Sequence, residues 1–269
     1  MNLENTAITT GRHLQKEKIA LAKKLANEWQ IPYVFRGSDS IEEIKEREKV
    51  SHILIIKENK LALATEEGEF FFHPNLAKMR LNNLERGGED YLITALNIAN
   101  GSRVLDCTLG FGSDAIIESY AVGDTGKVIA LEKNPVIATV IGYGLKHNKA
   151  EGDIEKYMRK IEVINADALT FLQKQADNSF DAVYFDPMFR HPLMESENLR
   201  PLRTLAETSP ITIETIAEAK RVAKDRVVLK ENARSLEFER LGFAEFVGGK
   251  YSKIKFGVYD ASDGKGQTQ

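Results

Sequence analysis

The stretch Val104–Asp114, which reads V-L-D-C-T-L-G-F-G-S-D, decides the fold that we predict for this chain. Its first two residues are typical of the end of a buried parallel strand, at whose carboxyl end Asp106 would lie. Gly110 and Gly112 indicate a loop in which the backbone packs closely, and the Ser-Asp pair after them can cap a helix. A strand, a glycine loop and a helix together predict the nucleotide-binding corner of an open α/β sheet.

Length and composition limit the classes of protein to which this chain can belong. The chain has 269 residues, 42% of them hydrophobic, which suits one large domain or a domain with a smaller partner. Its formal net charge of −3 and its pI near 6.0 exclude an overall basic field, although local basic faces are still allowed. The single Cys107 excludes an internal disulfide, and Met1–Thr10 lacks the apolar core of a signal peptide. Because no apolar run is long enough to span a bilayer, we predict a cytoplasmic protein with no membrane partner. We also predict no metal site.

Composition also divides the chain into three parts. Residues 1–85 predict a small N-terminal α+β subdomain, residues 86–260 the main domain, and the polar residues 261–269 a disordered tail. The boundary between the subdomains falls in residues 74–100, which fit either a solvated linker or a hinge that presents cations to the site.

Hydrophobic periodicity predicts the order of helices and strands. In the first part we expect helices over residues 14–29 and 41–49, and strands over residues 31–35, 52–56, 60–64 and 69–73. Thr9–Arg12 is interpreted as a capped helix start. From Gly101 onward, strands alternate with helices and a closing hairpin follows. The sequence therefore predicts an α/β fold with a doubly wound, mostly parallel, seven-stranded sheet.

Four of the predicted strands deliver an acidic side chain at or just past their carboxyl ends: Asp106, Glu132, Asp167 and Asp186. Ligands of a doubly wound sheet bind at this edge, so we expect the four carboxylates to converge there. Glu132 lies 20 residues past Gly112, the spacing at which an acidic residue accepts hydrogen bonds from ribose hydroxyls. Asp167 can accept from an adenine amino group or cap the next helix. Asp106 can face a ligand ammonium.

The tetrapeptide Asp186-Pro187-Met188-Phe189 is the sharpest motif in the chain. A proline directly after a strand stops the ladder and frees its own carbonyl oxygen. A carboxylate, a carbonyl and an aromatic ring suit a planar base with an exocyclic amino group, which Asp186 and Pro187 would hold while Phe189 stacks on the ring. We therefore predict Asp186, Pro187 and Phe189 as the catalytic residues. The alternative is a strand-end turn with Phe189 packed in the core.

The segments V-L-D-C-T-L-G-F-G, L-E-K-N-P, N-A-D-A and Y-F-D-P-M-F resemble motifs I to IV of class I S-adenosylmethionine-dependent methyltransferases. D-P-M-F is similar to the signature of enzymes that methylate amino nitrogens in nucleic acids. Together with V-V-L-K, ending at Lys230, these segments resemble the RsmJ-type family of small-subunit ribosomal RNA guanine-N2 methyltransferases. The resemblance is strongest over residues 101–191. It implies a Rossmann-like methyltransferase fold, S-adenosyl-L-methionine as the cofactor, and ribosomal RNA or the small ribosomal subunit as the partner.

The resemblance also implies which positions serve the cofactor and the acceptor. The expected cofactor-binding residues are Asp106, Gly110, Gly112, Ser113, Asp114, Glu132, Lys133, Asp167, Ala168 and Asp186. If the acceptor is RNA, cations that flank the site should form a local basic face. These cations are Lys78, Arg80, Arg86, Arg190, Arg200, Arg203 and Lys230. The alternative is that they are scattered surface charges.

Other interpretations stay open at this level. A methyltransferase that acts on a protein carboxylate or a small metabolite fits the acidic pI. A nicotinamide-dependent dehydrogenase is allowed by Ala115 in the third position of its glycine fingerprint, but D-P-M-F has no role in hydride transfer. A non-catalytic binding module would keep the glycine loop, yet it has no need of Asp186.

Overall fold

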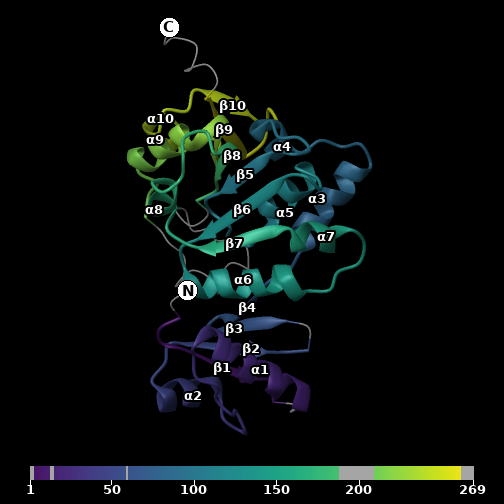
Figure 1. Cartoon of the computed structure of the whole chain (residues 1–269), viewed down its shortest axis with the longest axis vertical. Helices are drawn as coiled ribbons and strands as arrows, with labels where there is room; N and C mark the ends of the chain where they lie inside the picture. Colours follow the sequence, from purple (N-terminus) through teal and green to yellow (C-terminus); the bar gives the residue numbers. More distant parts are fainter. Residues whose placement is uncertain (1–2, 13–14, 59, 188–208, 262–269) are drawn as a thin grey trace. The chain divides into compact units, whose positions relative to one another are not determined.

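The computed structural model describes residues 3–12, 15–58, 60–187 and 209–261. Within these residues the chain forms two compact units, whose elements are labelled in Figure 1. The first unit holds the residues up to His73 together with Asn134–Lys149. The second holds Pro74–Lys133 and the described residues from Ala150 onward. The tail predicted to be disordered lies, from residue 262 onward, outside the described residues.

The first unit is a four-stranded sheet in the order β1-β2-β3-β4, with helices packed against it. Its elements are β1 (Thr6–Thr10), α1 (Lys16–Trp29), α2 (Ile41–Glu48), β2 (His52–Ile56), β3 (Leu61–Thr65), β4 (Gly68–Phe71) and α6 (Pro135–His147). β1 runs parallel to β2, and the other neighbours are antiparallel. A capping box begins α2: the Ser40 hydroxyl accepts the Glu43 N–H, and the Glu43 carboxylate accepts the Ser40 N–H.

Two predictions for the first unit are wrong. Thr6–Thr10 is a fully buried strand rather than part of a helix start, and the hydroxyl of Thr9 is satisfied by donating to the Val34 carbonyl at 2.8 Å. The strand predicted over residues 31–35 is reduced to a bridge between Tyr33 and Ile8. Pro32 explains the difference, because it has no N–H to donate to a ladder.

Helix α6 brings a segment from the middle of the chain into the first unit, where it packs on β3 and β4. The contact is close at Gly144, where any Cβ would collide with the side chain of Phe72. Trp29 adds an edge-to-face contact with Tyr143, with the ring centroids 6.4 Å apart.

The second unit is built on a seven-stranded sheet in the order β10-β11-β9-β8-β5-β6-β7. Its strands are β5 (Arg103–Asp106), β6 (Lys127–Glu132), β7 (Ile161–Asn165), β8 (Phe180–Phe185), β9 (Ala223–Asn232), β10 (Glu245–Val247) and β11 (Ile254–Asp260). The five strands from β7 to β9 are parallel, and β11 runs antiparallel to both of its neighbours. The predicted fold class, a doubly wound and mostly parallel sheet, is confirmed.

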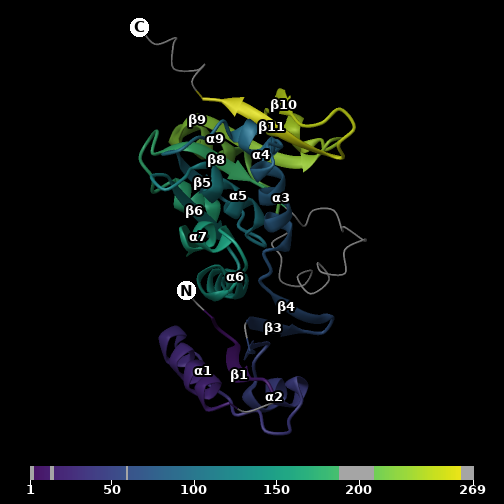
Figure 2. The same ribbon diagram turned by 90° about the vertical axis from the view of Figure 1, so that its right-hand side faces the viewer.

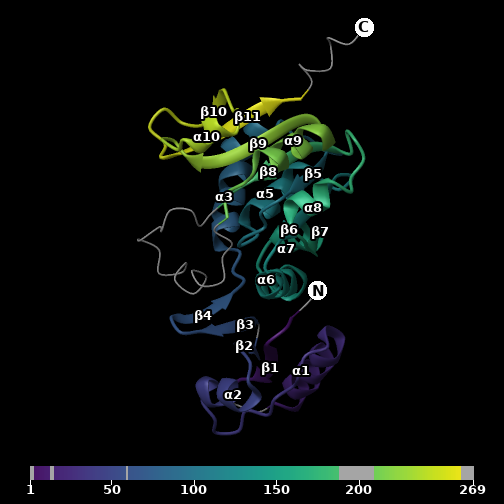
Figure 3. The ribbon, with the colours of Figure 1, turned by 90° about the vertical axis from the view of Figure 1, so that its left-hand side faces the viewer.

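Helices cover both faces of this sheet, as the fold class requires. They are α3 (Asn75–Glu85), α4 (Tyr91–Leu96), α5 (Ser113–Ala121), α7 (Ile154–Arg159), α8 (Ala168–Leu172), α9 (Ile213–Val222) and α10 (Glu237–Arg240). Helices α4 and α5 pack on one face, with α3 against α5 (Figure 2). On the other face (Figure 3), apolar residues of α8, α9 and α10 join alternate strand residues in one core cluster. Helix α9 is capped by Thr212, whose side chain accepts the Thr215 N–H.

Residues 74–100 are not a solvated linker. They form α3 and α4, which bury Ala77, Leu81 and Leu92 among their apolar residues. In the part of the chain that the structure describes, none of the helices combines the length and apolarity that crossing a bilayer requires.

Candidate active site

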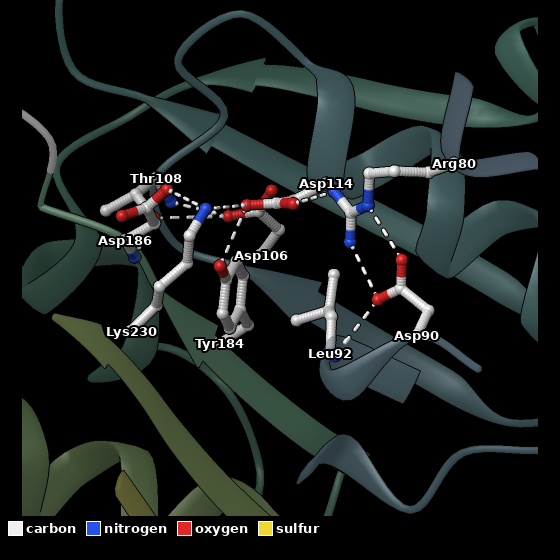
Figure 4. Close-up of polar contacts among 9 residues, drawn as sticks. All are labelled: Arg80, Asp90, Leu92, Asp106, Thr108, Asp114, Tyr184, Asp186 and Lys230. Atoms are coloured by element: carbon white, nitrogen blue, oxygen red, sulfur yellow. Dashed lines mark hydrogen bonds and ion pairs between the residues drawn. The ribbon is translucent and has the colours of Figure 1, made fainter. Parts of the chain in front are cut away.

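The carboxyl ends of β5 and β8 lie side by side, because these strands pair directly. The strand order reverses here, since β5 pairs with β6 on one side and β8 on the other, and ligands bind at such a point. Asp106 ends β5, Asp186 follows β8, and Thr108 ties the two together (Figure 4). Thr108 donates its N–H to Asp106 Oδ1 at 2.8 Å, and its Oγ1 accepts the Asp186 N–H at 2.6 Å.

Asp114, in the first turn of α5, is the centre of the contacts in Figure 4. The expectation that it or Ser113 caps the helix is wrong, because the N-cap is Gly112, whose φ of 75° glycine adopts at little cost. The Asp114 carboxylate instead accepts from the Tyr184 hydroxyl and the Lys230 ammonium, each at 2.8 Å. It also pairs with the guanidinium of Arg80.

Lys230, on β9, joins Asp114 to Asp186. Its Nζ lies 2.8 Å from Asp114 Oδ2 and 2.7 Å from Asp186 Oδ2. Side chains alternate between the faces of a strand. Leu229 packs in the core with α8, α9 and α10, so Lys230 faces the side of the sheet that carries α5.

Arg80, on α3, extends these contacts away from the sheet. Its Nε and Nη2 donate to the Asp90 carboxylate at 2.8 and 2.9 Å, while Nη1 pairs with Asp114. Asp90 also caps α4 by accepting the Leu92 N–H at 3.0 Å. One set of contacts therefore fixes α3 and α4 to α5. We call Arg80, Asp90, Asp106, Asp114, Asp186 and Lys230 the buried cluster.

Burial and charge shift the pKa values of this cluster in different directions. Asp106 is 1% exposed, its Oδ2 has no hydrogen-bond partner among the described residues, and burial raises its pKa to about 8. Burial also raises the pKa of Asp186 to about 6, although the Lys230 ammonium opposes the rise. For Asp114, burial is outweighed by the charges of Lys230 and Arg80, which hold its pKa well below the usual range. At neutral pH, Asp106 is therefore mainly protonated and Asp114 ionised.

Glu132 and Asp167, at the ends of β6 and β7, lie in a more open setting. The Glu132 carbonyl accepts the side-chain amide of Asn165 at 2.8 Å. Lys133 Nζ lies 3.5 Å from Asp167 Oδ2, and the two side chains are 48% and 42% exposed. Asp167 Oδ1 accepts the Thr170 N–H at 3.1 Å and so caps α8, which is the alternative role that the sequence allowed. We call Glu132, Lys133 and Asp167 the open edge.

Part of the predicted acceptor site cannot be placed. Phe189, the expected stacking residue, lies outside the described residues, as do Met188, Arg190, Arg200 and Arg203. Pro187 is described and is partly exposed directly after Asp186.

The structure corrects the basic face that the sequence allowed. Arg80 and Lys230 are members of the buried cluster, with side chains only 22% and 24% exposed, because each is held between carboxylates. Lys78 Nζ lies 3.5 Å from Glu151 Oε2, and Arg86 is exposed at the end of α3. For Lys230, the sequence does indicate a position inside the sheet, because the residue directly follows the apolar strand residues V-V-L.

The residues of the second unit fit the predicted S-adenosyl-L-methionine. The buried cluster pairs two cations with three carboxylates in its ion pairs, which leaves one negative charge beside the strand ends. That charge suits a ligand that carries a sulfonium and an ammonium group. The unpartnered Oδ2 of Asp106 offers such a cation an acceptor. Gly110 and Gly112, in the loop between β5 and α5, have φ values of 50° and 75°, and neither carries a side chain that would keep a ligand from the backbone.

Comparisons with known proteins agree with this geometry. The family model described as "Putative SAM-dependent methyltransferase" matches residues 40–259. An uncharacterized protein, YpiP, of Bacillus subtilis is 40% identical over 240 residues, which span 88% of this chain and 92% of YpiP. "Ribosomal RNA small subunit methyltransferase J" of Thioalkalivibrio sulfidiphilus is 30% identical over 151 residues, 54% of this chain and 58% of that protein. The protein of the same name in Legionella pneumophila, strain Philadelphia 1, is 29% identical over 183 residues, 66% of this chain and 72% of its own.

A solved structure shows the same fold. The crystal structure of a SAM-dependent methyltransferase from Neisseria gonorrhoeae superposes with a TM-score of 0.66 and 19% identity, covering 95% of this chain and 96% of that one. The predictions of a class I methyltransferase and of its cofactor are thus confirmed, and the dehydrogenase and binding-module interpretations are set aside. The chain belongs to the family of SAM-dependent methyltransferases and uses S-adenosyl-L-methionine.

Proposed function

We propose that the protein transfers a methyl group to the N2 amino group of a guanine in small-subunit ribosomal RNA. The observation that carries this proposal is the carboxylate of Asp186, which stands at the switch point of the sheet and is followed by a proline. The names of the Thioalkalivibrio and Legionella relatives support an rRNA acceptor.

The cofactor would be held along the carboxyl edge of the sheet. We assign Glu132 to the ribose hydroxyls, Asp106 to the methionyl ammonium, and Asp167 Oδ2 with its neighbour Lys133 to the adenine side. Gly110, Gly112, Ser113 and Ala168 would approach the ligand through their backbones. Asp114 is assigned differently from the sequence prediction: both of its oxygens are engaged by protein donors, so we propose that it supports Lys230.

The bound cofactor supplies an activated methyl group, so the protein needs alignment more than a strong base. The nitrogen of a guanine amino group is delocalised into the ring. Asp186 and the Pro187 carbonyl would accept its two hydrogens and so point the nitrogen at the methyl group. The Asp186 carboxylate would then stabilise the positive charge that nitrogen gains during transfer, and Phe189 would stack on the base. The proton that the methylated nitrogen loses would pass to Asp186 or to water.

One observation favours a second class of methyl acceptor. Two cations expected to face RNA, Arg80 and Lys230, are internal ion-pair members, which leaves fewer cations for a phosphate backbone. A small-molecule or protein acceptor needs no such face, so it is the alternative.

Mass analysis of nucleosides from a strain that lacks the gene separates the two. If the proposal is right, one N2-methylguanosine disappears from small-subunit ribosomal RNA and returns when the wild-type gene is supplied. The gene carrying Asp186→Asn should not restore it. Unchanged RNA modification in the deletion strain would favour the alternative acceptor.

A further inference from the structure

Lys230 contacts the proposed catalytic carboxylate, Asp186, but has no assigned role in the proposed reaction. Its ammonium bridges the carboxylates of two separate elements, Asp114 on α5 and Asp186 after β8. Lys230 itself lies on a third element, β9. The alternation of strand residues places its side chain on the face of the sheet that carries α5.

The two carboxylates depend on this ammonium to different degrees. Asp114 is also held by Tyr184 and Arg80, so it keeps two donors if Lys230 is removed. For the side chain of Asp186, Lys230 is the hydrogen-bond donor among the described residues, and it binds Oδ2. Removing Lys230 should therefore change Asp186 much more than it changes the anchoring of α5.

We propose that Lys230 is a positioning residue for methyl transfer. Its ammonium holds Oδ2 of Asp186 and keeps this carboxylate ionised, so that Oδ1 is presented to an N–H of the acceptor. The inference rests on the proposed function only in requiring an acceptor N–H, and the hold on Asp186 can be measured without any acceptor.

The charges around Asp186 explain why a cation is needed. Negative charge on Asp114, on α5, and on Glu231, on β9, disfavours ionisation of Asp186, while Asp106, on β5, is mainly protonated at neutral pH. Arg80, the other cation of the buried cluster, is used by Asp90 and Asp114. With Lys230 gone, burial and the Asp114 carboxylate are no longer opposed, so the pKa of Asp186 rises and Asp186 takes up a proton more readily. A protonated Asp186 accepts an N–H less well and cannot stabilise positive charge on the acceptor nitrogen.

The first test follows the Asp186 carboxyl directly. Its pH titration is recorded by ¹³C NMR in protein labelled at aspartate carboxyls, with Asp186→Asn used to assign the signal. We expect Lys230→Met to raise the apparent pKa by about one unit or more, the size of effect that a close opposite charge exerts. Lys230→Arg should leave it near the wild-type value. An unchanged titration in Lys230→Met would overturn the proposal.

The second test asks whether this hold matters for transfer. Single-turnover methylation is measured from pH 6 to 9 on small subunits that lack the modification. With the Asp186 pKa raised by about one unit from about 6, Lys230→Met should lose about twofold of the rate at pH 7 and about fivefold near pH 6, and recover it at higher pH, where Asp186 ionises again. Lys230→Arg should restore the wild-type profile. A loss that is equal at every pH, or an arginine variant that matches the methionine variant, would show a merely structural role and overturn the proposal.

Controls separate this inference from folding and from the proposed acceptor. Lys224→Met lies on the same strand but removes an exposed pair with Asp181, 3.4 Å away, and should change neither measurement. Thermal unfolding and calorimetric binding of S-adenosylmethionine identify a misfolded variant. If Lys230→Met does not fold, Lys230→Gln replaces it, because the amide is neutral yet still a donor. A wild-type protein that methylates no subunit would refute the guanine proposal, while the titration would still decide the role of Lys230.

Discussion

The two halves of the sheet's carboxyl edge carry the same residue type in different physical states. In one half, Asp106 is buried at the end of β5, and Lys230 on β9 joins the largely buried carboxylates of Asp186, after β8, and Asp114, on α5. At the ends of β6 and β7, Glu132 and Asp167 are partly exposed, and Asp167 caps a helix. Buried carboxylates have shifted pKa values and fixed geometry, which suits alignment and charge stabilisation. Exposed carboxylates suit the recognition of hydroxyl and amino groups. Burial, more than residue type, therefore separates the proposed acceptor chemistry at Asp186 and the proposed ammonium contact at Asp106 from the proposed recognition of ribose and adenine.

The largest effect is expected at Asp186, in the buried half. Asp186→Asn keeps the shape but removes the charge that would stabilise the acceptor nitrogen, so single-turnover transfer should fall about 100-fold or more. Affinity for S-adenosylmethionine, measured by calorimetry, should change only a few-fold. Near-normal transfer by this variant would show that the chemistry lies elsewhere.

Glu132 should show the opposite pattern. Glu132→Ala would lose two charge-assisted hydrogen bonds to ribose, each worth about 1.5–3 kcal/mol, so cofactor affinity should fall at least about tenfold. Transfer at saturating cofactor should be much less affected. Glu162→Ala removes another exposed carboxylate, paired with Lys127 at 2.8 Å on the neighbouring strand, and is the matched control. Equal cofactor affinity in the two variants would remove Glu132 from the binding site.

Asp106 predicts a pH dependence of cofactor binding. Burial raises its pKa to about 8, so at pH 7 most molecules hold a proton there. If the ligand ammonium binds the ionised form, binding releases that proton. Affinity should then rise with pH, by up to about tenfold per unit below the pKa, and level off above it. Calorimetry in two buffers of different ionisation enthalpy counts the protons. No proton release at pH 7, or affinity that falls between pH 6 and 8, would contradict this assignment.

Asp106 also predicts a pH dependence of stability. Its folded pKa is raised above the unfolded value, so its contribution is fully present at low pH and is lost as pH rises towards about 8. Asp106→Asn should flatten this decline in the free energy of unfolding, measured by denaturant titration between pH 5 and 8. A decline of the same size in the variant would place the responsible group elsewhere.

The smallest effect is expected at Asp167, in the open half. Asp167→Ala should lose the cap of α8, which is worth about 0.5–2 kcal/mol of stability. Asp167→Asn keeps an acceptor at the cap and should restore that stability. If Asp167 also serves the cofactor, affinity should drop a few-fold in both variants, since Oδ2 becomes an amide or is lost. Wild-type affinity in both variants would leave Asp167 as a cap alone.

Much of this arrangement follows from local sequence signals. Alternating strands and helices, a glycine loop and an acid after each strand are enough to place Asp106, Glu132, Asp167 and Asp186 along one edge, because parallel strands end together. The same reasoning fails where tertiary contacts decide. Arg80 was expected to face RNA, yet its partner Asp114 lies 34 residues away, and nothing local marks the pair. The strand Thr6–Thr10 was missed because buried threonines resemble a helix cap when their partner, the Val34 carbonyl, is not known.

The destination of the methyl group tests the proposed function most directly. Purified protein is incubated with methyl-labelled S-adenosylmethionine and small ribosomal subunits from a strain that lacks the gene, and the labelled nucleoside is identified by mass spectrometry. We expect N2-methylguanosine, formed by the wild-type protein but not by Asp186→Asn, and no labelling of subunits from the parent strain. Label in another nucleoside, or none in RNA while S-adenosylmethionine still binds, would contradict the guanine-N2 proposal.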